Sequence, residues 1–304
     1  IGWCDWSSDV CSSDLTGKFL AIHARSLKNP KNAAQWRSTL ETYAWPSLGN
    51  LPVDQIDRTM ILQILEPLWG VKTETANRVR ARIAAVLDWA AESGHRDQNT
   101  PNPARKEHFK KSLPAQSKVQ KVKHHAALPI DEAPAFLGLL REKSGAATRA
   151  FEFCILTATR TSETIEARWP EIDKAQRVWV IPAERMKMGV MHRVPLSDRA
   201  LKILDEMTPC RGEGDYIFPG AKAERPLSNM AFLMLIRKMG RKGLTAHGFR
   251  STFRDWCAER TETLSEVAEA ALAHAVDSKV EAAYRRGDLF EKRRELMARW
   301  DAFL

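Results

Sequence analysis

The chain has 304 residues, of which 44% are hydrophobic and 28% are charged, a balance typical of globular rather than disordered proteins. Its longest apolar run, Ala231 to Ile236, is far shorter than the roughly 18 to 20 residues of a membrane-spanning helix, which excludes a transmembrane protein. Lys and Arg outnumber Asp and Glu by 47 to 38, so a polyanionic partner is favoured and nucleic acid is the leading one.

The N-terminal leader has an unusual composition. Ser7 to Cys11 and Ser12 to Leu15 form a near-repeat with neither the apolar core of a signal peptide nor a helical period. The leader resembles translated sequencing adapter. Residues 1–15 are therefore excluded from the predicted fold, and we expect the native N-terminus of the gene product to be missing. The five cysteines show no C-x-x-C spacing, which fits a reducing cytoplasm.

A small helical domain is predicted over residues 16–104, because apolar residues recur at helical spacing from Leu20 to about Gly94. In its clearest helix Thr73 or Thr75 serves as the N-cap, and Gly94 provides the C-terminal stop. Three arginines of this helix lie off the apolar stripe and form either a solvated basic face or a contact to DNA phosphates: Arg78, Arg80 and Arg82.

A basic linker is predicted over residues 105–127, where seven Lys and Arg side chains stand against one acid, Glu107. The seven are Arg105, Lys106, Lys110, Lys111, Lys118, Lys121 and Lys123. A tether that lies along DNA would need this composition, because neutralising phosphates releases counterions and drives binding without sequence preference. A merely solubilising linker is the alternative.

Residues 128–304 show a mixed pattern. Helices are predicted at 130–142 and 146–158, strands at 177–181 and 192–196, a short strand at 215–218, and helices from there to the C-terminus. The predicted fold class is therefore mainly α with a small β-sheet, in which a helical domain precedes a larger mixed α/β domain. The chain contains no phosphate-binding loop, no H-E-x-x-H motif and no G-x-S-x-G elbow, so no cofactor and no metal are expected.

The most informative segment is Thr245 to Cys257. On a helix its aromatic residues share one stripe, while His247, Arg250 and Arg254 fall on an adjoining one. An imidazole and a guanidinium one turn apart can hold one phosphate from two sides. Alone, however, H-x-x-R is common in structural helices.

Three further elements accompany this helix. Arg160 stands where one apolar helix, 151–158, ends and another, 162–168, begins. Downstream, His274 is followed ten residues later by Tyr284, which is the only one of the three tyrosines flanked by arginines.

The ordered set Arg160, His247-x-x-Arg250, His274 and Tyr284 resembles the tyrosine recombinases, the phage-integrase family, over about residues 16–304. The surrounding residues look most like integrases of temperate phages and integrative islands. The resemblance implies a helical core-type DNA-binding domain over 16–104 and a tyrosine-recombinase catalytic domain over 128–304.

The resemblance also implies residue roles. Arg160 and Arg250 would clamp the scissile phosphodiester and stabilise its transition state. Tyr284 would be the nucleophile, which forms a 3′-phosphotyrosyl link and frees a 5′-hydroxyl. This link conserves the energy of the phosphodiester, so rejoining requires no ATP.

The remaining catalytic roles concern protons and orientation. Lys187, between the two predicted strands, is similar in position to the family's general acid. By the same resemblance His247 would assist proton transfer at Tyr284, and His274 would donate to a phosphate oxygen. Glu163 would orient the arginines or His247. These cations would supply the positive charge that a metal would otherwise bring.

The resemblance further implies double-stranded DNA attachment sites as the substrate, a homotetramer on DNA, and DNA-bending and directionality factors as accessory partners. The expected location is the prokaryotic cytoplasm, at the nucleoid, with no membrane association. The sequence departs from the family in two places: Ala273 replaces a frequent Gly before the second histidine, and nothing matches the N-terminal arm-binding domain.

Several alternatives remain open at this point. A catalytically inactive DNA-binding remnant and a type IB topoisomerase-like enzyme both fit part of the pattern, whereas a metal-dependent nuclease is opposed by the missing carboxylate cluster. The C-terminal apolar residues either dock on a neighbouring protomer or pack on their own domain: Leu289, Phe290, Leu296, Trp300 and Phe303.

Overall fold

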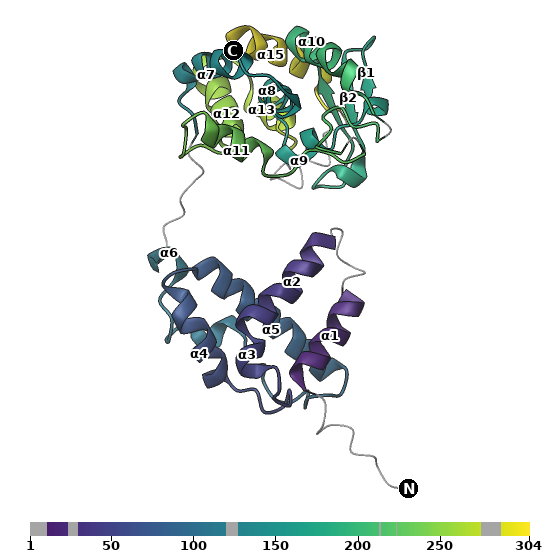
Figure 1. The fold of residues 1–304 in the computed structure, drawn as a ribbon. Coiled ribbons are helices and arrows are strands. Elements are labelled where there is room, and N and C mark those ends of the chain that lie inside the picture. The colour runs from purple at the N-terminus through teal and green to yellow at the C-terminus, as the bar shows by residue number, and fades with distance from the viewer. Residues whose placement is uncertain (1–10, 24–29, 120–126, 213, 223, 275–286) are drawn as a thin grey trace. The chain divides into compact units, whose positions relative to one another are not determined.

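The computed structural model describes residues 11–23, 30–119, 127–212, 214–222, 224–274 and 287–304 (Figure 1). The chain divides into an N-terminal unit, Ile1–Lys123, and a C-terminal unit, His124–Leu304. Each unit packs around a hydrophobic core of its own. The fold is mainly helical with one small sheet, as predicted.

The described part of the N-terminal unit is helical throughout. Its elements are α1 (Ser12–His23), α2 (Pro30–Tyr43), α3 (Trp45–Leu48), α4 (Arg58–Trp69), α5 (Thr73–Glu92), the 3-10 turn η1 (Lys106–Phe109) and α6 (Gln116–Val119). Helix α4 starts at Asp57, whose carboxylate accepts a hydrogen bond from the backbone N–H of Met60 at 2.9 Å. Helix α5 supplies nine buried side chains and packs against α1, α2 and α4.

The ends of α5 follow the prediction at one terminus only. Gly94, with φ of +77°, confirms the predicted stop, because glycine enters the left-handed region at no steric cost. The predicted threonine N-cap is wrong. Lys72 occupies the N-cap position without a side-chain capping bond to the helix, and the Thr73 hydroxyl instead donates to the Trp69 carbonyl at 2.6 Å.

Residues 12–15, which were excluded from the predicted fold, form the first turn of α1. Leu15 is fully buried in the N-terminal core, and the Ser12 hydroxyl donates to the carbonyl of Leu48. The side chain of Thr16 donates back to the Ser12 carbonyl at 2.7 Å. Burial and hydrogen bonding thus extend four residues further toward the N-terminus than the predicted domain boundary at residue 16.

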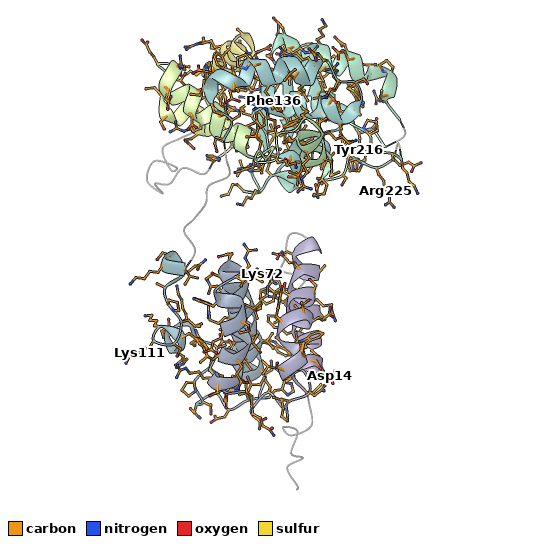
Figure 2. All side chains as sticks on the ribbon, turned by 60° about the vertical axis from the view of Figure 1, so that its left-hand side comes forward. Asp14, Lys72, Lys111, Phe136, Tyr216 and Arg225 are labelled. Atoms are coloured by element: carbon orange, nitrogen blue, oxygen red, sulfur yellow. The ribbon has the colours of Figure 1, made fainter. Side chains whose placement is uncertain are left out.

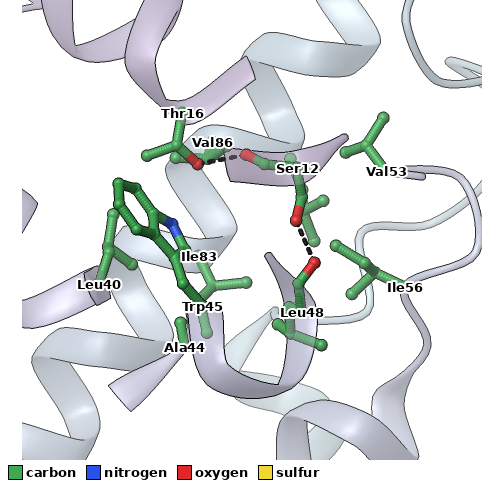
Figure 3. A pocket seen from close by; sticks show the side chains of 11 residues that line it. Ser12, Thr16, Leu40, Ala44, Trp45, Leu48, Val53, Ile56, Ile83 and Val86 are labelled. Carbon is green, nitrogen blue, oxygen red and sulfur yellow. Dashed lines mark hydrogen bonds between the residues drawn. The ribbon is translucent and has the colours of Figure 1, made fainter. Parts of the chain in front are cut away.

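The same packing encloses a cavity of about 20 Å³ between α1, α3 and α5 (Figure 3). Its walls are mostly aliphatic, and the hydroxyls of Ser12 and Thr16 are already bonded to carbonyls. This volume is about that of a single water molecule. The cavity is therefore a packing defect rather than a ligand site.

The first half of the predicted linker is not a tether. Phe109 and Leu113 are buried in the N-terminal core, and the Trp69 indole donates to the carbonyl of Pro114 at 2.9 Å. Gln116 donates to the carboxylate of Glu74 at 2.8 Å. The chain from 105 to 119 therefore folds back on α4 and α5, because two apolar side chains four residues apart outweigh the charge around them.

The C-terminal unit combines helices with a three-stranded sheet (Figure 1). Its described helices are α7 (Ala133–Arg141), α8 (Ala146–Thr157), α9 (Thr161–Ile165), α10 (Asp198–Met207), α11 (Ala231–Lys238), α12 (Gly248–Arg260), α13 (Ser265–Ala271) and α15 (Phe290–Phe303). Short 3-10 turns are η2 (Ile130–Glu132), η3 (Trp169–Glu171), η4 (Ala183–Arg185) and η5 (Thr208–Cys210).

The sheet is antiparallel in the order β1 (Ile172–Asp173), β2 (Val178–Ile181), β3 (His192–Pro195). Strands β2 and β3 confirm the two predicted strands, and Trp179 pairs with Val194. Residues 215–218 form only an isolated bridge between Arg168 and Tyr216 rather than the predicted strand. The helix predicted at 162–168 is also shorter than expected, since α9 ends at Ile165.

Helix α15 packs on its own unit, which contradicts docking of its apolar residues on a neighbouring protomer. Trp300 is 1% exposed, donates its indole N–H to the Ile155 carbonyl at 3.0 Å and lies 4.9 Å from the Trp256 ring. Leu296 is buried in the same core, whereas Leu289 and Phe303 are partly buried against it. Trp300 and Leu296 are therefore not available to a partner.

Candidate active site

Arg160 is positioned by the junction between α8 and α9. Helix α8 ends at Ala158, which takes a left-handed conformation with φ of 51°, and Arg160 then becomes the N-cap residue of α9. The buried carboxylate of Glu163 accepts from the backbone N–H of Arg160 at 2.8 Å and from its Nη1 at 2.7 Å. This carboxylate therefore fixes both the backbone and the guanidinium of Arg160.

Arg250 lies one helical turn into α12 and is only 5% exposed. Its Nη1 donates to the Ala158 carbonyl, its Nη2 donates to the Leu272 carbonyl at 2.5 Å, and its Nε has no partner among the described residues. Burial and the charge of Arg160 lower the pKa of Arg250 to about 10, so it still carries its charge at neutral pH.

His274 joins the two arginines. Its Nε2 lies 3.2 Å from Nη2 of Arg250, and its Nδ1 lies 2.6 Å from the carboxylate of Glu269. The preceding carbonyl, of Ala273, accepts from Nη2 of Arg160 at 3.2 Å. Three residues separated by up to 114 positions in the sequence thus meet in one hydrogen-bonded cluster, and we refer to Arg160, Arg250 and His274 as the Arg-Arg-His cluster.

Two alanines shape the backbone around this cluster. Ala158 and Ala273 have φ of 51° and 49°, a region that residues with a Cβ rarely adopt. Each turns a carbonyl toward one arginine of the cluster. The structure therefore gives a physical reason for a glycine before the second histidine: it would take this conformation without strain.

Lys187 and His247 are exposed. Lys187 lies in the connection between β2 and β3, and its ammonium group makes no hydrogen bond or ion pair with the described residues. Two residues earlier, Arg185 donates to the Glu163 carbonyl at 2.5 Å, which attaches this connection to α9. His247 is the N-cap residue of α12, three residues before Arg250.

Tyr284 lies outside the described residues, which end on one side at His274 and resume at Gly287. The hydroxyls of the other two tyrosines bond to basic side chains outside the Arg-Arg-His cluster. The Tyr216 hydroxyl accepts from Arg168 at 3.1 Å, and Tyr43 belongs to the N-terminal unit, where Lys72 donates to its hydroxyl at 3.5 Å. Neither of these two tyrosines is bonded to the Arg-Arg-His cluster.

Sequence reasoning missed two residues around the cluster, Glu269 and His192, and it placed Arg254 on the stripe of His247 and Arg250 without giving it a role. Glu269 and Arg254 form an ion pair at 2.5 Å directly behind His274. His192 on β3 is buried, and burial together with the charge of Arg293 lowers the pKa of His192 to about 4, so that its ring is neutral at pH 7. The alternation of β3, which turns His192 and Val194 inward, was the available sequence signal.

Past the segment with Tyr284, a second ion cluster anchors the chain. Asp288 accepts two hydrogen bonds of 2.8 Å from Arg193 on β3, and Arg293 lies 2.9 Å away. The Arg193 guanidinium also lies 4.3 Å from the centre of the Phe290 ring. The start of α15 is therefore fixed to the sheet.

The three basic residues predicted on α5 differ in access. Arg78 is exposed and pairs with Glu74 at 3.0 Å. Half-buried Arg80 donates to the Ala104 carbonyl at 2.8 Å. The prediction is wrong for Arg82, which is 6% exposed, donates to the Gln35 carbonyl at 2.8 Å and stacks on Trp36. Charge in a sequence does not reveal burial by a neighbouring helix.

The basic residues after α5 are mostly on the surface. Arg105 pairs with Asp88 at 3.0 Å, and Lys111 projects outward from the N-terminal unit (Figure 2). Also exposed are Lys106, Lys110 and Lys118. Lys121 and Lys123 lie outside the described residues. Folding of this segment therefore leaves a basic surface on the N-terminal unit.

None of the described helices is both long and apolar enough to cross a membrane. In the described ranges, no three or more His, Cys, Asp or Glu side chains are grouped as metal ligands.

Both units of the chain match domains of phage integrases. The phage integrase central domain matches residues 13–107, and the phage integrase family matches residues 127–289. The prophage integrase IntA of Escherichia coli (strain K12) is 35% identical over 270 residues, which cover 87% of this chain and 63% of that protein. The chain thus spans less than two thirds of this relative.

Solved structures share the fold. A lambda integrase tetramer bound to a Holliday junction matches with a TM-score of 0.67 at 18% identity, over 89% of this chain and 79% of that one. A lambda integrase dimer bound to a COC′ core site matches with a TM-score of 0.66 at 20% identity, over 92% of this chain and 78% of that one.

Proposed function

Because this chain belongs to the phage integrase family, we propose that it is a site-specific DNA recombinase that integrates or excises a mobile element. It would cleave and rejoin strands through a 3′-phosphotyrosyl intermediate, without metal or ATP. The observation that carries the proposal is the Arg-Arg-His cluster, in which residues from three separate segments share hydrogen bonds.

The cluster suits a phosphodiester for an electrostatic reason. Arg250 is a buried cation next to a second cation, Arg160, and its acceptors are two carbonyls and the ring of His274 rather than carboxylates. Among the described residues no carboxylate is bonded to Arg250, so its charge is only partly balanced by the more distant Glu163 and Glu269. An entering phosphate would supply the missing negative charge, and the pentacoordinate transition state, with more negative charge, would gain more.

The other catalytic roles follow from family membership. Tyr284 would attack phosphorus, Lys187 would protonate the departing 5′-oxygen, and His247 would assist proton transfer at Tyr284. Anchoring of the β2–β3 connection to α9 through Arg185 supports a place for Lys187 beside the cluster. His274 would donate to a phosphate oxygen.

Binding and assembly are proposed on the same basis. The N-terminal unit would act as a core-type DNA-binding domain and the C-terminal unit as the catalytic domain, with positioning by phosphate contacts from exposed basic residues. The lambda integrase structures contain a dimer on a core site and a tetramer on a Holliday junction. We propose that this chain likewise acts as a homotetramer on attachment sites, assisted by bending and directionality factors, at the nucleoid of a prokaryotic cell.

The test is covalent attachment to DNA. The protein is incubated with supercoiled plasmid in excess EDTA, quenched with SDS and assayed for bound protein and for relaxation. Wild type, Tyr284→Phe and Tyr216→Phe are compared. Tyr216→Phe is the matched control, because it removes a hydroxyl bonded to Arg168 and keeps the ring beneath that guanidinium.

An adduct and relaxation that persist in EDTA, vanish in Tyr284→Phe and survive in Tyr216→Phe would support the proposal. Strand exchange between two duplexes would then separate a recombinase from a topoisomerase that only relaxes DNA. DNA binding without an adduct, also on a candidate attachment site, would refute the enzymatic proposal and favour a DNA-binding remnant.

A further inference from the structure

His274 is bonded to two further charged residues outside the Arg-Arg-His cluster, directly to Glu269 and through it to Arg254. Arg254 on α12 donates from Nε to one oxygen of Glu269 at 2.5 Å, and the other oxygen of Glu269 lies 2.6 Å from Nδ1 of His274. Ser265 accepts a further bond from Arg254 at 3.1 Å. Glu269 is therefore held on one side by a guanidinium and on the other by the imidazole.

The hydrogen bonds determine where the proton of His274 lies. Nη2 of Arg250 can only donate, so Nε2 of His274, at 3.2 Å, must be the acceptor. The ring proton is then on Nδ1, from which it donates to Glu269. In this arrangement Nε2 has no proton to give to a phosphate oxygen.

A phosphate oxygen next to Nε2 would require a proton on that nitrogen. To donate from Nε2 while Nδ1 remains bonded to Glu269, His274 must bind a second proton, taken from solvent, and become an imidazolium. The Glu269 carboxylate would stabilise this cation at contact distance. Burial favours the neutral acid, but hydrogen bonds from Arg254 and His274 hold the pKa of Glu269 below its ordinary value, which keeps the carboxylate charged.

We infer that Glu269, braced by Arg254, is a positioning residue that orients His274 through Nδ1 and stabilises the imidazolium that donates from Nε2 to phosphate. The inference rests on the proposed function only for its last step. In the protein without DNA it already requires the Nδ1–H form of His274.

The surrounding charges make this protonation depend on DNA. Arg250, at Nε2, and Arg254, bonded to Glu269, oppose a further positive charge on the ring, whereas Glu269, at Nδ1, favours it. A phosphodiester beside Nε2 adds the negative charge that shifts this balance.

The experiment compares Glu269→Gln and Glu269→Ala with Glu262→Gln, which alters an exposed carboxylate just before α13. Covalent attachment to supercoiled plasmid is measured under single-turnover conditions between pH 6 and 8.5. Glu269→Gln keeps an acceptor for Nδ1–H but loses the charge. Its rate should be near that of wild type at pH 6 and about tenfold lower at pH 8, because without the adjacent negative charge the imidazolium is no longer stabilised where protons are scarce.

Glu269→Ala should be slow at every pH, since orientation is lost as well, and Glu262→Gln should follow wild type. DNA affinity, measured separately, should be equal in all four proteins. Parallel pH profiles of wild type and Glu269→Gln would overturn the inference.

A second measurement does not depend on cleavage. Histidine ¹⁵N spectra of the full chain without DNA, with the His274 signals assigned by His274→Gln, should show protonated Nδ1 and unprotonated Nε2 at pH 8. Glu269→Ala should abolish this pattern. If wild type forms no adduct but this pattern is present and lost in Glu269→Ala, the proposed function fails while the positioning role stands. A ring protonated on Nε2 in wild type refutes the positioning role.

Discussion

Replacement of Glu163 by glutamine should weaken the site by releasing Arg160. The carboxylate is 3% exposed and accepts two hydrogen bonds from Arg160, one from its backbone N–H at 2.8 Å and one from its Nη1 at 2.7 Å. An amide keeps one acceptor oxygen and places an NH₂ group against the other donor. One of the two bonds is therefore lost, and the remaining one no longer has an ionised acceptor.

A hydrogen bond to a charged group contributes about 1.5–3 kcal/mol, and a factor of ten in rate corresponds to about 1.4 kcal/mol. If the lost interaction holds Arg160 in its productive position, Glu163→Gln should lower the single-turnover rate of DNA attachment by about 10- to 100-fold. The free energy of unfolding of the C-terminal unit should fall by a similar 1.5–3 kcal/mol.

Both quantities are measured against Glu166→Gln, which alters a half-exposed carboxylate at the end of the same helix. DNA affinity serves as a check on folding. A rate within twofold of wild type, together with an unfolding free energy reduced as expected, would show that Glu163 stabilises the fold without positioning Arg160. If instead the Glu163→Gln effect persists undiminished in an Arg160→Gln background, Glu163 acts through another residue such as His247.

Glu152→Gln should lower the free energy of unfolding of the C-terminal unit by about 3–5 kcal/mol in calorimetry, with Glu142→Gln as an exposed control, because it removes the charge of a fully buried carboxylate that pairs with three part-buried arginines, Arg141, Arg149 and Arg199. In the folded wild-type protein the pKa of Glu152 lies below 4.5. Burial alone would raise this pKa, but the hydrogen bonds from the arginines lower it by more. Its stabilisation is therefore present above pH 4.5 and is lost as the pH falls through the folded-state pKa. Ala273→Gly should retain DNA attachment and raise the unfolding free energy by up to about 1 kcal/mol; a clear loss of stability would contradict the strain at φ of 49°. Lys111→Gln should reduce the slope of log K against log salt for DNA binding by about 0.9, whereas Arg82→Gln should leave that slope unchanged and destabilise the N-terminal unit.

The helices and the cluster were predictable because they depend on local pattern and order. The aromatic stripe of α12, with Phe249, Phe253 and Trp256, is buried as its periodicity indicates. Arg160, Arg250 and His274 were named from their order in the chain, and their meeting in space is a property of the fold that no local pattern encodes.

What could not be predicted depends on tertiary contacts. Arg82 and Arg78 are indistinguishable by composition, yet α2 covers the first and not the second. Glu269 matches no motif. It reaches His274 because the chain turns back at Ala273 in a left-handed conformation, which an alanine in the sequence does not predict. In the basic segment after residue 104 the charges obscured Phe109 and Leu113, whose four-residue spacing was the only sign of packing.

The arrangement of acids and carbonyls around the cluster explains how the site retains charge for a substrate. Carboxylates hold Arg160 and His274 from one side, through Glu163 and Glu269. Arg250, between them, is held by neutral carbonyls, and burial beside Arg160 lowers its pKa to about 10. A carboxylate in place of those carbonyls would compete with phosphate for the same donors. Neutral acceptors fix the position of the guanidinium without pairing its charge. The free-energy cost of burying Arg250 is therefore offset when an anion binds, and most fully at the transition state, where the negative charge is greatest.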